Sequence, residues 1–396
     1  MNREHRRKYL FEFAKDKINY KNKFYKIIFH AEEDDIYRIM RVVGNNSSMR
    51  ARMERILFPR TIHDMCSNKI VINTEINMEY LRSYYIKVFS EYSSYIERYI
   101  LLKEQYEKYL FSEQYREALH IIDSIEEQLG LSVWSISKKM LLFDKIEGLE
   151  KHKRYLSELQ SKADNNIILS TLFELESYFA ESNTSYSAYK KRLESYNDIL
   201  QENYIIRQYL DFKFNVEREY EHEEVKVAFM FDSQLSIVDM YETFVLAEQL
   251  MFAEGIKSRE RLEIKDFRLC NLGLIEEPGK IGTQRNENYD LLELYTCGEY
   301  QQYIEKCEQY LVAAPQDFQC IILLVKSYIF LQKEMKCTNS LYKWIYDVYS
   351  LNGNEIEAIQ ELFAYLKVVR FTSWEYKIIG FIARKTTMSQ RSLNVR

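Results

Sequence analysis

Apolar residues recur along most of the chain at intervals of three and four positions, which is the spacing of one face of an α-helix. Residues 4–29 show this spacing first, with Leu10, Phe13 and Phe24 near the helical period of about 3.6 residues. A second helix is expected at 32–43, because the acidic run at its start complements the helix dipole. The opening of the chain therefore predicts helices joined by short connections.

The same spacing continues through most of the remaining sequence. The further segments that it predicts to be helical are 50–57, 78–110, 114–129, 133–146, 148–161, 166–181, 185–215, 234–254, 258–272, 289–297, 299–312, 316–333, 339–350 and 355–368. Residues 68–77 interrupt the pattern and fit either a short strand or an irregular turn. The acidic run 217–224 is expected to be a solvated face.

Composition points in the same direction. The chain has ten Gly and three Pro in 396 residues, whereas average usage is about 7% and about 5%. Sheet proteins need many tight turns built from these residues, so the predicted class is all-α, a helical repeat or α-solenoid with an N-terminal helical region. Its 33 Tyr are expected to pack their rings between helices and leave their hydroxyls at the solvent edge.

Four segments are expected along the chain. They are a basic N-terminal helical region (1–77), a helical repeat region (78–272), a linker or loop (273–288) and a C-terminal helical region (289–396). The linker is placed where Gly and Pro concentrate, at Gly273, Pro278, Gly279 and Gly282.

The C-terminal region carries a recognisable spacing. Gly298 stands at a tight turn between paired helices, Tyr300 follows it, and Pro315 lies where the second helix would end. These positions resemble the tetratricopeptide repeat (TPR), a helix–turn–helix unit of about 34 residues. Tyr303 occupies the place of the family's small residue, which implies looser or shifted packing.

A second segment resembles the same repeat. Tyr115 and Ala118 occupy the two family positions on the second helix, while Glu113 replaces the turn glycine and Gly130 stands where the closing proline would be. Gly148 suggests that a neighbouring unit follows. The resemblance covers about a quarter of the chain and implies a TPR-like superhelix that binds peptides or proteins, without implying any reaction.

Patterns that accompany catalysis are incomplete in this sequence. There is no H-E-x-x-H, C-x-x-C or G-x-S-x-G pattern, and Gly279–Lys280 lacks the spacing of a phosphate loop. His30 and Glu32 match only half of a zinc-deaminase signature, and His63 and Cys66 supply two of the four ligands that a zinc site needs. The sequence therefore predicts no enzyme activity, no cofactor and no metal site.

Charge is unevenly distributed along the chain. Residues 1–30 carry nine Lys and Arg against three Asp and Glu, although the whole chain has a net charge of −5. The predicted binding surface consists of Arg6, Arg7, Lys8, Lys15, Lys17, Arg50, Arg52 and Arg55. Aromatic residues such as Tyr9 and Phe11 interleave with this charge, a combination that often holds single-stranded nucleic acids. The alternatives are a solvated helix that packs its aromatic side on the core and a docking arm for an acidic protein.

Two function hypotheses follow. The leading one is a non-catalytic scaffold or adaptor that binds a protein partner or peptide, one version being an accessory subunit of a bacterial antiviral-defence or regulatory complex. The other is a nucleic-acid-binding helical protein that uses the basic N-terminal region. The absence of a long apolar run and of a signal peptide predicts a cytoplasmic protein that does not enter a membrane, and the sequence leaves its oligomeric state open.

Overall fold

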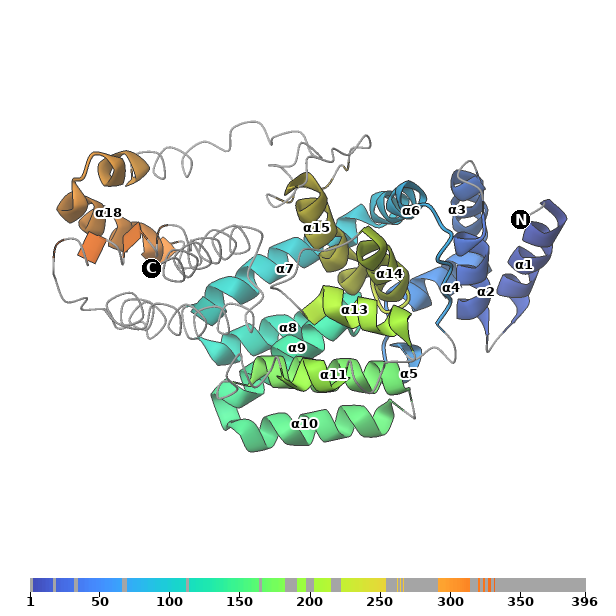
Figure 1. The fold of residues 1–396 in the computed structure, drawn as a ribbon, viewed down its shortest axis with the longest axis horizontal. Coiled ribbons are helices and arrows are strands. Elements are labelled where there is room, and N and C mark those ends of the chain that lie inside the picture. Colours follow the sequence, from blue (N-terminus) through green and yellow to red (C-terminus); the bar gives the residue numbers. More distant parts are fainter. Residues whose placement is uncertain are drawn as a thin grey trace, which may run out of the picture. The chain divides into compact units, whose positions relative to one another are not determined.

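The computed structural model confirms the expected all-α class (Figure 1). The residues that it describes are 3–16, 19–31, 35–65, 70–111, 114–163, 166–181, 191–196, 203–214, 222–253 and 291–313, with single positions between 262 and 331. These residues form helices joined by short turns, and none of them lies in a β-strand. No helix in the described part is long and apolar enough to span a membrane.

The helices follow one another with few residues between them. They are α1 (Arg3–Lys15), α2 (Tyr20–Phe29), α3 (Ile36–Asn45), α4 (Ser47–Leu57), α5 (Ile62–Met65), α6 (Met78–Glu91), α7 (Ser93–Phe111), α8 (Tyr115–Leu129), α9 (Val133–Glu147), α10 (Leu149–Lys162), α11 (Ile167–Ala180), α13 (Tyr204–Phe214), α14 (His222–Asp232), α15 (Ile237–Ala253) and α18 (Tyr300–Ala313). Residues 191–196 and 291–296 are helical as well.

The chain divides into two compact units. The first contains α1 to α6, α9 to α11 and α13 to α15, and the second contains α18, while α7 and α8 have residues in both. The predicted basic region 1–77 thus belongs to the same unit as α9 to α15, although the sequence suggested a separate segment. The predicted linker 273–288 lies outside the described residues.

Two of the expected helices are interrupted. The segment expected to be one helix at 4–29 ends as α1 near Asp16, whose carboxylate accepts a hydrogen bond from the Asn19 amide at 2.8 Å. Arg52 donates to the carbonyls of Phe13 and Asp16, so these acceptors are satisfied without a further helical turn. The segment expected at 78–110 is likewise divided, by a turn at Tyr92 between α6 and α7.

The segment 70–77 is an irregular loop, which was one of the two alternatives for this part of the sequence. The side-chain amide of Gln234 holds it in place, because its oxygen accepts from the Val71 amide and its nitrogen donates to the Val71 carbonyl, both at 2.9 Å. Asn73 adds a hydrogen bond from its side chain to the Phe29 carbonyl at 2.6 Å. Side chains therefore satisfy this backbone where a neighbouring strand would otherwise do so.

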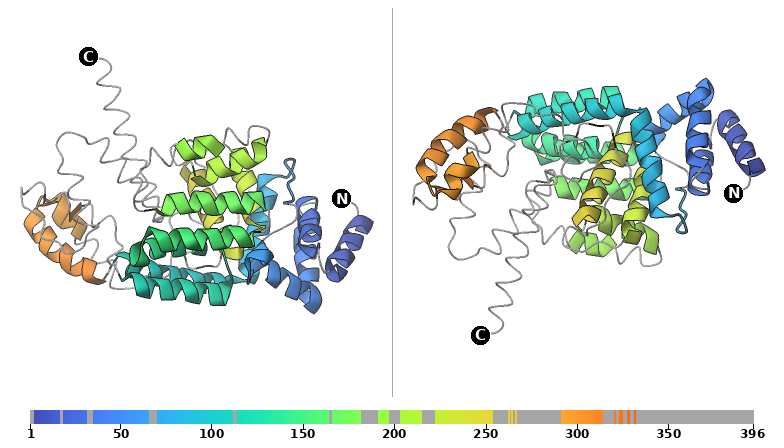
Figure 2. Two further views of the ribbon diagram at one scale, coloured as in Figure 1. Left: turned by 90° about the horizontal axis from the view of Figure 1, so that it is seen from below. Right: turned by 90° about the horizontal axis from the view of Figure 1, so that it is seen from above.

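Successive helices of the first unit pack against one another. α10 lies against α9 and α11, α13 against α14, and α14 against α15 (Figure 2). Aromatic rings fill the space beside them, with Tyr85 stacked on Phe229 at a centroid distance of 4.4 Å. Three tyrosines depart from the expected placement of hydroxyls at the solvent edge, since Tyr25, Tyr80 and Tyr85 are buried and donate to backbone carbonyls. A buried hydroxyl needs such a partner to offset the loss of water.

Candidate functional site

The predicted basic surface is only partly exposed in the structure. Arg7, Lys8 and Lys15 lie on the exposed side of α1. The side chain of Arg6, and Lys17 as a whole, lie outside the described residues. Three of the eight predicted residues, Arg7, Lys8 and Lys15, are therefore described as exposed cations on α1.

The three predicted residues on α4 are engaged with neighbouring groups. Arg52 donates to the Phe13 carbonyl at 2.6 Å and to that of Asp16, which secures the end of α1. Arg50 pairs with Glu54 one turn later on the same helix, at 3.1 Å. Arg55 pairs with Asp64 at 3.2 Å. Arg52 thus has a structural role that the sequence did not indicate.

Lys21 and Arg60 are two further cations whose roles the sequence did not reveal. Lys21 is buried and its ammonium donates to the Asp64 and Met65 carbonyls, at 3.3 and 3.1 Å, at the end of α5. Arg60 donates to the Glu126 carbonyl at 3.3 Å, near the end of α8. Cations commonly satisfy the last carbonyls of a helix in this way. No sequence signal distinguishes these two residues from binding cations.

Asp64 organises the turn beneath this region. Its carboxylate accepts from the Thr61 hydroxyl at 2.9 Å and from the Arg60 amide at 3.3 Å. Burial opposes ionisation, but the hydrogen bond from Thr61 and the charge of Arg55 outweigh it and hold the pKa of Asp64 below its usual range. Much of the positive charge near α4 therefore serves to fix α4 and α5.

Among the repeat markers, Gly298 has a clear conformational role. It has a φ of +79°, its amide donates to the Tyr295 carbonyl at 3.1 Å, and the Glu299 amide donates to the Leu294 carbonyl at 2.9 Å. This pair of bonds is a Schellman motif, in which glycine takes the left-handed position after a helix. Tyr300 begins α18 immediately afterwards, and Pro315 lies outside the described residues.

The other repeat markers differ in burial. Ala118 is completely buried on α8, while Tyr115 is half-buried. Tyr303, at the family's small position, is also completely buried, and its hydroxyl donates to the Cys320 carbonyl at 3.2 Å. A large ring at this place is thus packed inside the second unit, with Tyr295 as a neighbour at a centroid distance of 5.5 Å.

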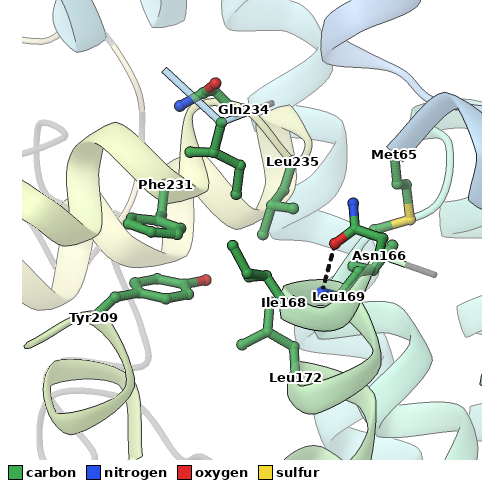
Figure 3. A pocket seen from close by; sticks show the side chains of 10 residues that line it. Met65, Asn166, Ile168, Leu169, Leu172, Tyr209, Phe231, Gln234 and Leu235 are labelled. Carbon is green, nitrogen blue, oxygen red and sulfur yellow. Dashed lines mark hydrogen bonds between the residues drawn. The ribbon is translucent and has the colours of Figure 1, made fainter. Parts of the chain in front are cut away.

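A small apolar cavity lies between α11, α13 and α14 in the first unit (Figure 3). Tyr209 and Phe231 stack on one side of it at a centroid distance of 4.3 Å, and Ile168 and Leu172 face them from α11. Its volume is about 10 Å³, which is at the lower limit for holding one water molecule. A metabolite of ordinary size does not fit in this space.

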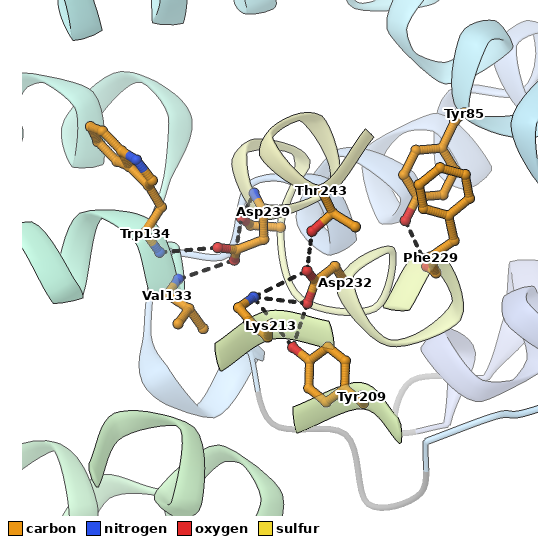
Figure 4. A network of polar contacts seen from close by, with 10 residues as sticks. Tyr85, Val133, Trp134, Tyr209, Lys213, Phe229, Asp232, Asp239 and Thr243 are labelled. Atoms are coloured by element: carbon orange, nitrogen blue, oxygen red, sulfur yellow. Dashed lines mark hydrogen bonds and ion pairs between the residues drawn. The ribbon is translucent and has the colours of Figure 1, made fainter. Parts of the chain in front are cut away.

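A cluster of buried ionisable groups adjoins this cavity through Tyr209 (Figure 4). Asp232 lies at its centre and accepts hydrogen bonds from the hydroxyls of Tyr209 and Thr243. The ammonium of Lys213 lies 3.0 Å from the same carboxylate. Burial raises the pKa of Tyr209 well above its usual value, so its hydroxyl stays protonated and donates.

A second carboxylate of this cluster, Asp239, binds the start of α9 (Figure 4). It accepts from the amides of Val133 and Trp134, both at 3.0 Å, and from the Ser236 hydroxyl at 2.8 Å. Burial raises its pKa to about 6, although the charge of Lys213 and these hydrogen bonds oppose the shift. Asp239 therefore caps a helix distant in sequence, besides belonging to the cap of its own helix.

The sequence reasoning missed this cluster of buried charged and hydroxyl side chains. Ser236 and Asp239 match the spacing of a helix capping box, which is the one signal that the sequence offered. The cluster joins α9, α13, α14 and α15, and its carboxylates are at most 2% exposed. Chemically, it can hold helices together, but a substrate cannot reach it without their separation.

Titratable residues elsewhere form no group of three that suits a metal ion, as far as the described residues extend. His30 directs its Nδ1 toward the Lys26 carbonyl at 3.1 Å, and His63 is exposed on α5. The acidic run departs in part from the expected solvated face, because Glu224 is buried whereas Glu223 is exposed.

Comparison with protein-family models, with curated proteins and with solved structures finds no match.

Proposed function

We propose that this chain is a non-catalytic, TPR-like scaffold that binds a protein partner. The observation that carries the proposal is the closure of the Asp232–Asp239 cluster, whose ionisable groups bind one another and the backbone of α9. Groups that would serve general acid–base chemistry elsewhere are here used for helix packing. The outer faces of the helices then provide the functional surface, as in other helical repeats.

The helical pair 291–296 and α18 is the proposed contact for the partner. Gly298 ends its first helix in a Schellman motif, and Tyr303 is buried on its inner face. Val312 on α18 is 81% exposed, the highest value among the large apolar side chains described. When a partner covers large apolar side chains at a surface, the free energy of the system falls because apolar area is removed from water.

The test has two stages. The full chain, carrying an affinity tag, is recovered from its native host with and without nuclease treatment, and stoichiometric proteins are identified by mass spectrometry. The purified partner is then titrated against Val312→Asp and against Gln302→Asp, which adds the same charge at an exposed position about 15 Å away along α18. We expect the first variant to weaken binding by about tenfold or more and the second to leave it unchanged.

The alternative outcomes are distinct. If no stoichiometric protein survives nuclease, the scaffold proposal fails. If a partner binds Val312→Asp and Gln302→Asp equally well, the scaffold proposal stands and the contact on α18 fails. The identity of a partner would also test the narrower proposal that the chain is an accessory subunit of a bacterial defence or regulatory complex.

The cysteines support a reducing, cytoplasmic setting for this scaffold. Cys307 and Cys320 are buried in the second unit as free thiols, and the Sγ of Cys307 lies 3.5 Å from the carbonyl oxygen of Cys320. Disulfides form and persist mainly in oxidising compartments.

A further inference from the structure

The exposed face of α1 combines positive charge with one aromatic ring. Arg7, Phe11 and Lys15 are four residues apart and therefore share a helix face, with Lys8 beside them. All four are exposed, and Phe11 retains 56% of its accessible surface. The opposite side of the helix packs inward through Phe13, which is completely buried. Phe11 is thus not needed to fill the core.

The cations on this face differ from Lys23 on α2 and from Arg52 on α4. Arg7 and Lys8 make no hydrogen bond or ion pair with any described residue, although the charge of Lys8 acts on Glu12 one turn along α1. The ammonium of Lys15 lies 4.0 Å from the centroid of the Phe11 ring. By contrast, Lys23 pairs with Glu12 at 2.6 Å and Arg52 binds backbone carbonyls. The charge on the α1 face is therefore available to an anionic partner.

The composition of the face distinguishes between two kinds of anionic partner. The centre of a protein interface is depleted of charge, and lysine in particular is rare there. Here one ring lies among three cations, which leaves too little apolar surface for such a centre. Single-stranded nucleic acids are held by this combination, because cations follow the phosphates while an aromatic ring stacks on a base. Along the helix, Arg7 and Lys15 are about 12 Å apart, with Phe11 midway.

We infer that the exposed face of α1 binds single-stranded nucleic acid. Arg7, Lys8 and Lys15 contact successive phosphates, and a base stacks on the Phe11 ring. An unpaired strand is required, because the bases of a duplex are already stacked on one another. The inference is independent of the protein partner proposed above, whose contact lies on α18 in the other unit.

The test uses the full chain and a fluorescently labelled oligothymidine, with binding followed by anisotropy at several salt concentrations. Phe11→Ala is expected to raise the Kd by about 5- to 150-fold, the range for loss of one base–aromatic stack. Phe11→Tyr keeps a ring and should bind like the wild type. Lys8→Glu and Lys15→Glu should weaken binding by about tenfold or more and reduce its salt dependence.

Matched controls come from elsewhere in the first unit. Tyr204→Ala removes a ring that is 64% exposed on α13, and Lys162→Glu reverses an exposed charge on α10. Neither should change the Kd, and circular dichroism should show equal helix content in all variants. An absence of binding at low salt, or equal Kd values for Phe11→Ala and Tyr204→Ala, overturns the inference. Displacement by polyglutamate as effective as that by unlabelled oligothymidine would instead assign the face to an acidic protein.

Discussion

Gly130 lies against the backbone of Pro59 so closely that a Cβ atom built on it would be 2.5 Å from the Pro59 carbonyl oxygen. The Leu131 amide donates to that same oxygen at 2.7 Å, so the two segments are held together at this point. Gly130 also has a φ of +79°, which side-chain-bearing residues rarely adopt. Residues 58–60 and the connection between α8 and α9 therefore meet where only glycine fits.

Replacing Gly130 with alanine should destabilise the first unit more than the same change at Gly148. Gly148 has a φ of +87° but open space around a built Cβ, so its substitution carries only backbone strain of about 1–3 kcal/mol. At Gly130 the clash with backbone adds about 1–3 kcal/mol more. Urea unfolding followed by circular dichroism compares the two variants. Equal losses would show that the contact with Pro59 relaxes at little cost.

Asp239 should make the first unit more stable as the pH falls from 7 toward 5. Its folded pKa is about 6, above the usual value of 3.8, so the folded state binds a proton over this range more readily than the unfolded state. The gain is about 1 kcal/mol at pH 5. Asp239→Asn removes this titration and, at pH 7, costs about 1–3 kcal/mol because a buried amide loses its acceptor. Free energies of unfolding at pH 7, 6 and 5 check this, and a wild-type advantage that stays constant would contradict it.

His152 should have the opposite effect over the same range. It is completely buried on α10, with its Nε2 2.8 Å from the Ser177 hydroxyl, and burial together with the charge of Lys153 lowers its pKa to about 4. The unfolded chain, with a pKa near 6.5, therefore binds the proton first, and the wild type loses about 2 kcal/mol by pH 5. His152→Gln keeps a hydrogen-bonding group without titrating, so its stability should fall less on acidification. Parallel pH profiles for the two proteins would rule out this role.

Helices were predictable from sequence because their signal, a repeated apolar spacing, comes from residues close together in the chain. The positions at which helices end were not predictable, because they also depend on contacts with residues distant in sequence. The end of α1 rests on the bond between Asp16 and Asn19 and on Arg52, which comes from another helix. The apolar spacing of a helix does not indicate that a guanidinium distant in sequence, here that of Arg52, will satisfy carbonyls at the end of α1.

The candidate sites illustrate the same limit. Arg50, Arg52 and Arg55 look alike in sequence, yet Arg52 binds backbone carbonyls whereas the other two pair with carboxylates. The buried cluster around Asp232 was missed because its side chains come from three helices and their burial is set by packing, while the capping-box spacing of Ser236 and Asp239 indicates only the start of a helix. Exposure of the α1 face was open to prediction, since Arg7, Phe11 and Lys15 follow helical spacing, but the lack of a hydrogen bond or ion pair from Arg7 and Lys8 to the described residues was not.

The buried ion pair between Arg82 on α6 and Glu248 on α15 allows the coupling between two buried charges to be measured as a free energy of unfolding. Both side chains are at most 6% exposed, and the guanidinium donates to both carboxylate oxygens. Arg82→Met alone should cost about 3–5 kcal/mol, because Glu248 would be left buried without a counter-charge. The double variant Arg82→Met/Glu248→Leu should recover most of that loss, since two apolar side chains of similar size suit the site. Unfolding free energies of the four proteins complete the cycle, and simple addition of the two single losses would mean that the pair is not coupled.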